Sequence, residues 1–183
     1  VDVSWPVCWA TSLKKKGKKI YLLSNAQRIF TEYEMHTLGI AKYFDDIFIS
    51  STCGIKKPDS RFFQLLIDKY NLDITKSVMI GNDGISDIAG AKSVGLDTFY
   101  IHSNISPKDD KKPDSTYYLP AMDMKKVKEL MSFGRQPDFF LLVLIRGDFY
   151  NRVYTGLDGP PTLELENEKF SYYKVAIPYG VAN

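Results

Sequence analysis

The sequence predicts an α/β fold with a Rossmann-like parallel sheet and helices on both faces. Apolar strands and amphipathic helical segments alternate along residues 13–131. The strands are nearly continuous apolar runs, which are typical of parallel strands buried on both faces. Small polar or acidic residues follow several of these strands, at the carboxyl ends where ligands bind in folds of this class.

Four apolar runs bounded by polar residues or glycine predict the strands. The first follows a basic pair and ends at Ser24, and the others end near Ser51, Asn82 and Ile101. Their ranges are 18–24, 44–51, 76–82 and 96–101.

The segments between and after the strands predict helices at 26–40, 57–70, 87–95 and 122–131. In the first, Ile29, Tyr33 and Leu38 recur at helical spacing, and Gly39 marks the end. In the second, Pro58 and Asp59 suit the first turn. Its apolar face is predicted to consist of Phe62, Phe63, Leu66 and Tyr70. The third is rich in small residues and ends at Gly95, and the fourth has a charged outer face.

The composition changes after residue 132, which predicts a two-part organisation. Residues 1–132 form the α/β core, and residues 133–183 form a segment rich in β-branched and aromatic residues whose turn signals predict three or four strands.

Bulk properties argue against several classes of protein. The formal net charge of +2 gives no strong attraction to nucleic acid or to a membrane surface. The longest apolar run, 139–145, is too short to span a bilayer. Two cysteines, Cys8 and Cys53, without metal-type spacing favour a reduced, cytoplasmic setting. No nucleic-acid or membrane partner is therefore expected.

Ser24 and Asn25 are the first candidates for ligand binding. A hydroxyl at a strand end, followed by a helix start, suits the oxygen of a phosphate or carboxylate. The alternative is that Ser24 only caps the helix.

Lys57 is the second candidate. It precedes Pro58, so it lies in an extended or turn conformation from which it can reach an anion at the sheet edge. The alternatives are a solvated surface lysine, or Lys56 in the same role.

Asp83 and Asp87 form a candidate Mg²⁺ site. Carboxylates at a strand end are ligands that Mg²⁺ takes, with waters and a substrate phosphate completing the shell, and Asn82 can add an oxygen. The alternative is that Asp83 caps the following helix and Asp87 stabilises its first turn.

Three segments in this order, 20–27, 54–63 and 78–101, resemble the haloacid dehalogenase-like hydrolase superfamily over about residues 13–131. The resemblance implies Mg²⁺ and phosphate-ester hydrolysis through an aspartyl-phosphate. By position, Ser24 resembles the phosphate-binding residue, Lys57 the catalytic lysine, and Asp83 and Asp87 the acidic metal site. The sequence Gly81-Asn82-Asp83 departs from the commoner Gly-Asp of the superfamily. It leaves open whether Asn82 or Asp83 stands at the first metal-ligand position.

The nucleophile motif of that superfamily, an apolar strand ending in Asp-x-Asp, is missing from this sequence. The resemblance therefore implies a core that lacks its first strand and its cap domain. The segment around Asp158 has Gly156 in the nucleophile's place, and the apolar run 139–145 is followed by Arg146 and Gly147. One alternative is a chain that returns its first strand from the C-terminus. Two functions follow: a phosphatase for a small phosphorylated metabolite whose nucleophile lies outside this sequence, or a non-catalytic module that binds a phosphorylated ligand or a protein partner.

Overall fold

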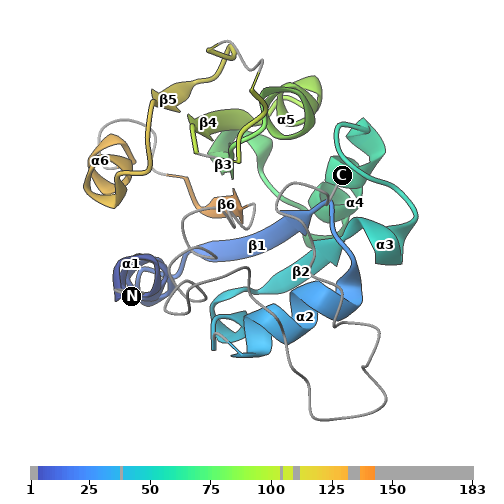
Figure 1. Cartoon of the computed structure of the whole chain (residues 1–183), viewed down its shortest axis with the longest axis horizontal. Coiled ribbons are helices and arrows are strands. Elements are labelled where there is room, and N and C mark those ends of the chain that lie inside the picture. The colour runs from blue at the N-terminus through green and yellow to red at the C-terminus, as the bar shows by residue number, and fades with distance from the viewer. Residues whose placement is uncertain (1–3, 38, 104, 109–111, 132–136, 143–183) are drawn as a thin grey trace, which may run out of the picture.

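Six parallel strands form a single sheet in the order β2-β1-β6-β3-β4-β5 (Figure 1). The computed structural model describes residues 4–37, 39–103, 105–108, 112–131 and 137–142. The strands are β1 (Lys19–Ser24), β2 (Asp46–Ile49), β3 (Ser77–Gly81), β4 (Asp97–Ile101), β5 (Tyr117–Leu119) and β6 (Phe139–Leu142). All five pairings are parallel, so the carboxyl ends of the strands lie at one edge of the sheet.

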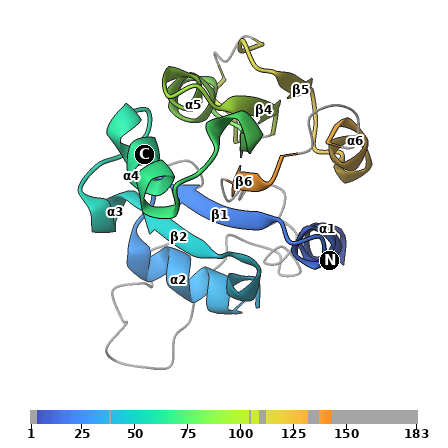
Figure 2. The same ribbon diagram turned by 180° about the vertical axis from the view of Figure 1, so that it is seen from behind.

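Helices cover both faces of the sheet. Figures 1 and 2 show α1 and α6 together at one side of the molecule and α4 and α5 at the other. The α-helices are α1 (Ser4–Lys15), α2 (Arg28–Thr37), α3 (Ser50–Cys53), α4 (Ser60–Tyr70), α5 (Gly90–Ser93) and α6 (Met124–Leu130). Two 3-10 turns, η1 (Ala41–Tyr43) and η2 (Ile74–Lys76), and a π-helical turn, η3 (Gly84–Ala89), complete the described elements.

The sheet separates two hydrophobic clusters because alternate residues of each strand point to opposite faces. One cluster joins strand residues such as Leu23 and Met79 to the buried face of α4. The other joins Ile20 and Val78 to residues of α1 and α6. Strand β6 contributes to both, with Leu141 in the first cluster and Phe140 in the second.

Strand β6 lies in the middle of the sheet although it comes last in the described chain. Phe139 pairs with Lys19 of β1 on one side and with Ser77 of β3 on the other. Asp138 anchors the start of the strand, since its backbone oxygen accepts from Lys19 N at 2.9 Å and its N–H donates to Lys76 O at 2.8 Å. Its carboxylate also pairs with Lys18 Nζ at 2.6 Å.

The predicted fold class is confirmed, and the four predicted strands and helices are present with shifted ends. Helices α1 and α3 and strand β5 were not predicted. In α4 the aromatic pair Phe62 and Phe63 is buried as expected, whereas Ile29 and Tyr33 of α2 are exposed. The strand at 139–142 lies beyond the predicted core of 1–132, yet it pairs inside the sheet between β1 and β3. This position is the one required by the alternative in which a C-terminal segment supplies the missing strand. Residues 143–183 lie outside the described part, so their predicted strands stay a prediction.

Tyr21 of β1 gives a test of this core. Burial raises its pKa to about 12, and the nearby Asp45, Tyr70 and Asp46 add to the shift. A tyrosine whose pKa is raised on folding contributes stability that is fully present below its ordinary pKa of about 10 and is lost as pH rises toward 12. This rise in the pKa corresponds to a loss on the order of 2–3 kcal/mol in the free energy of unfolding.

We expect the wild-type chain to lose more free energy of unfolding than Tyr21→Phe between about pH 9 and pH 11.5. Urea unfolding of both proteins at the two pH values gives this difference, and other groups that titrate in the interval affect both alike. Equal losses in the two proteins would show that Tyr21 is not buried as described.

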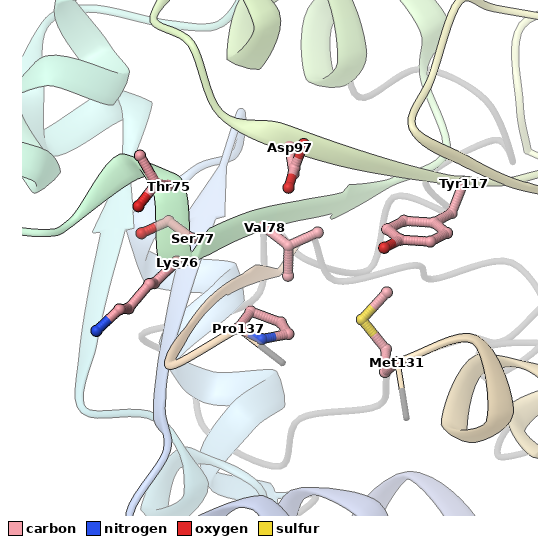
Figure 3. Close-up of a pocket in the computed structure, with 8 residues that line it drawn as sticks. All are labelled: Thr75, Lys76, Ser77, Val78, Asp97, Tyr117, Met131 and Pro137. Carbon is pink, nitrogen blue, oxygen red and sulfur yellow. The ribbon is translucent and has the colours of Figure 1, made fainter. Parts of the chain in front are cut away.

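No helix in the described ranges is long and apolar enough to cross a membrane. A small cavity of about 10 Å³ lies where β3, β4 and β5 begin, lined by Val78, Asp97, Tyr117 and neighbours (Figure 3). It has room for about one water molecule. Because it lies at the amino edge of the sheet, it is remote from the predicted site residues, which follow the carboxyl ends.

Candidate active site

Ser24 and Asn25 lie at the carboxyl end of β1. Ser24 is 6% exposed, and among the described residues its hydroxyl has no hydrogen-bond partner. Helix α2 is capped instead from α3, where Ser51 Oγ accepts from Arg28 N at 2.9 Å. The Ser24 hydroxyl is therefore available to a ligand rather than used as a helix cap.

Asn25 holds the backbone of Lys57. Its side-chain oxygen accepts from Lys57 N at 2.8 Å, and its Nδ2 donates to Lys57 O at 2.9 Å. This two-point contact joins the end of β1 to the loop before α4. Asn25 was predicted to bind substrate. In the structure its side-chain amide is hydrogen-bonded to the backbone of Lys57, so its contribution to ligand binding stays a prediction.

Lys57 is buried at 3% exposure, which rules out the alternative of a solvated surface lysine. Its Nζ donates to Leu23 O at 2.8 Å and to Asp87 Oδ1 at 2.6 Å. An ammonium group has three protons, so one remains for a further acceptor. Lys56 is exposed and lines an open surface hollow. Of the two neighbouring lysines, Lys57 is therefore the one that lies at the candidate site.

Asp87 is the buried partner of Lys57, with both side chains 2% exposed. Its second oxygen, Oδ2, accepts from the backbone N–H groups of Asn82 at 3.1 Å and Asp83 at 3.0 Å. Gly81 leaves room for this carboxylate, because a Cβ there would lie 2.4 Å from Asp87 Oδ2. Both oxygens of Asp87 are thus occupied by protein groups, and its role as a direct metal ligand stays a prediction.

Asp83 caps the π-helical turn that follows β3. Its Oδ1 accepts from Ile85 N at 2.9 Å and Ser86 N at 2.7 Å, as the capping alternative requires. Its Oδ2 has no hydrogen-bond partner in the described part of the chain, and the same holds for Oδ1 of Asn82, whose Nδ2 donates to Ser103. Single π-helical turns occur frequently at functional sites.

These two oxygens, which lack a partner within the described ranges, suit Mg²⁺ because this ion needs few ligands from the protein. Over the ranges that the structure describes, no three His, Cys, Asp or Glu side chains are grouped to hold a metal ion. Mg²⁺ commonly uses only one or two protein oxygens and completes its octahedron with waters and phosphate. Asn82 Oδ1 and Asp83 Oδ2 could supply such a set.

The structure therefore brings the predicted residues to one edge through direct contacts. Lys57 links the end of β1 to Asp87, and Asp87 links Lys57 to the turn of Asn82 and Asp83. The sequence analysis missed Ser103, which contacts Asn82 from the loop after β4. In the sequence, Ser103 is marked only by its position two residues after the predicted strand end at Ile101. Serines are so common near strand ends that this position alone does not indicate a site residue.

Comparison with protein families gives a match to the model described as haloacid dehalogenase-like hydrolase over residues 9–95. Strands β4, β5 and β6 lie outside this matched segment. The sheet described here is thus completed by residues that the family model does not cover.

Curated relatives match at low identity. Glyceraldehyde 3-phosphate phosphatase of Methanothermobacter thermautotrophicus is 27% identical over 65% of this chain and 54% of that protein. Phosphoserine phosphatase of Thermus thermophilus is 25% identical over 62% of this chain and 45% of that protein. The chain thus spans about half the length of these relatives.

Solved structures agree on the fold. A HAD phosphatase from Thermococcus onnurineus has a TM-score of 0.59 at 21% identity and covers 69% of this chain and 56% of its own. The magnesium-bound putative HAD-hydrolase YfnB of Bacillus subtilis also has a TM-score of 0.59 at 21% identity, over 69% of this chain and 53% of its own. At these identities the likeness establishes the architecture.

Proposed function

The α/β part of this chain belongs to the haloacid dehalogenase-like hydrolases, and from that premise we propose that it acts on the phosphoryl group of a small phosphorylated metabolite in a Mg²⁺-dependent hydrolysis. The observation that carries the proposal is the buried Lys57, fixed between Leu23 O and Asp87. It lies at the edge where the Ser24 hydroxyl has no partner among the described residues. Phosphatases among the relatives support the choice of a phosphate ester as the substrate class.

The residues of this edge have separable roles in the proposal. The Ser24 hydroxyl donates to one phosphoryl oxygen, and the remaining proton of Lys57 donates to another. Asp87 keeps the ammonium group in place and is itself held by two backbone N–H groups. Because Lys57 is buried and is held beforehand by Leu23 O and Asp87, its ammonium group can stabilise developing charge without reorganising.

Mg²⁺, when bound through Asn82 Oδ1 and Asp83 Oδ2, would neutralise charge on the phosphoryl oxygens. The attacking group must be a carboxylate placed in line with the leaving group. Asp87 is unsuited to this role because both of its oxygens are engaged. We therefore assign the attack to a carboxylate outside the described residues.

The position of β6 favours a second candidate function, a module that binds a phosphorylated ligand without hydrolysing it. We expect an attacking carboxylate to lie between the ends of β1 and β3, which Lys57 and Asp87 link, and β6 is the strand that lies there. The residues that follow it in the sequence, Val143, Leu144 and Ile145, are apolar. This strand thus brings no carboxylate directly to the position that catalysis needs.

One experiment separates the two functions. Calorimetric titration of the full chain with inorganic phosphate in Mg²⁺ measures binding, and p-nitrophenyl phosphate measures turnover. Binding with turnover supports the hydrolase, and binding without turnover supports the binding module. Absence of both would refute a phosphate site at this edge.

Ser24→Ala is expected to weaken phosphate binding about tenfold, because one hydrogen bond to a charged group contributes about 1.5 kcal/mol. Its stability should change little, since the hydroxyl has no partner in the described part of the protein. Ser93→Ala is the control, because Ser93 Oγ donates only to Gly90 O at the far end of α5. If both variants bind phosphate equally well, Ser24 is not a ligand.

A further inference from the structure

A tight turn follows β4 at the same edge of the sheet. Ser106 N donates to Ser103 O at 3.0 Å, and Ser103 N donates to Ser106 Oγ at 3.0 Å. Both serines are buried, with 6% and 8% exposure. Neither belongs to the segments that resemble the superfamily motifs, and neither has a role in the proposed function.

The turn is connected to Asn82 by two more hydrogen bonds. Ser106 Oγ donates to the backbone oxygen of Asn82 at 2.7 Å, and Asn82 Nδ2 donates to Ser103 Oγ at 3.2 Å. Asn82 N is held separately by Asp87 Oδ2. Three of the four polar groups of Asn82 are therefore fixed, and Oδ1 is the one left without a partner among the described residues.

The turn itself is anchored to the sheet. His102 N donates to Leu119 O of β5 at 2.9 Å, and the His102 ring lies 3.2 Å from the hydroxyl of Tyr100. The side-chain amide of Asn82 donates to Ser103 of this turn, so the anchored turn restricts the rotation of that amide. The anchoring thus passes from β5 through the two serines to the orientation of Asn82.

We propose that Ser103 and Ser106 are positioning residues that orient Asn82 Oδ1 toward a divalent cation. The inference rests on the proposed function, because it takes the Asn82 and Asp83 oxygens as the cation side of the site. Ser103 fixes the side-chain amide through Nδ2, and Ser106 fixes the backbone that carries it. Groups that orient a metal ligand in this way commonly affect metal affinity by tenfold or more.

The test measures cation affinity and stability separately on the full chain. Ser103→Ala and Ser106→Ala are expected to weaken Mg²⁺ binding about tenfold in calorimetric titration, with phosphate binding in the absence of Mg²⁺ unchanged. Ser77→Ala is the matched control. Ser77 is 1% exposed, and its hydroxyl donates to Asp73 O at 2.7 Å, the distance found for Ser106, but at the opposite edge.

A purely structural role predicts a different pattern. The three variants would then lose similar free energy of unfolding in urea and bind Mg²⁺ as the wild-type chain does, which would overturn the inference. If Ser106→Ala does not fold, Ser103→Ala still tests the inference. This variant removes only one long hydrogen bond, that from Asn82 Nδ2, and is therefore expected to fold. A wild-type chain that binds phosphate but no Mg²⁺ would refute the cation part of the proposed function and this inference with it.

Discussion

Lys57→Met is expected to lower the free energy of unfolding by about 3–5 kcal/mol, because it leaves the Asp87 carboxylate buried without a counter-charge. The pair is 2.6 Å apart with both side chains 2% exposed, so solvent cannot replace the missing ammonium group. The same change removes the donor to Leu23 O and should abolish detectable phosphate binding. Urea unfolding and phosphate titration measure the two effects.

Two further variants make this prediction specific. Lys56→Met alters the neighbouring exposed lysine and should change stability by less than about 0.5 kcal/mol. Adding Asp87→Asn to Lys57→Met removes the unpaired charge and should restore part of the lost stability without restoring phosphate binding. If Lys57→Met is as stable as Lys56→Met, the buried ion pair does not exist in solution.

Phe140→Ala in β6 is expected to destabilise the chain by about 3–5 kcal/mol, the usual range for removing a buried phenylalanine. Phe140 is 2% exposed in the cluster beneath α1 and α6, and its ring meets that of Trp9 edge-on at a centroid distance of 5.7 Å. This result would establish that β6 belongs to the folded core. Chemical denaturation followed by circular dichroism gives the measurement.

The control for Phe140 is an aromatic residue of similar size at an exposed position. Tyr33 of α2 is 47% exposed, and Tyr33→Ala should cost less than about 1 kcal/mol. If truncating Phe140 is as mild as truncating Tyr33, β6 is not the central strand in solution, and the argument for the binding module loses its basis.

Local sequence signals were sufficient for most of the sheet and for expecting the candidate site residues at its carboxyl edge. The apolar runs before Ser24 and Asn82 predicted buried strands, and the position of Lys57 before Pro58 predicted a side chain near the ligand edge. These inferences need only short-range information. The same holds for the Asp83 cap, which depends on residues two and three positions away.

Long-range pairings could not be read in this way. The apolar segment 139–142 predicts a strand, but its neighbours are more than fifty residues away in the chain, and nothing local specifies them. Likewise, Asp87 was assigned to a metal because its spacing from Asp83 suggested it. Its contact with Lys57, thirty residues away, depends on how the strands are ordered.

The place of β6 also determines how this protein can be assembled during synthesis. In the described sheet β1 and β3 share no ladder, so β6 is the link between β2-β1 and β3-β4-β5. Until residues 139–142 have emerged from the ribosome, a nascent chain can form only two half-sheets, each with an open apolar edge. Completion is then expected to be late and slow, because it depends on contacts distant in sequence. Chaperone dependence should accordingly be greatest just before the ribosome releases this segment.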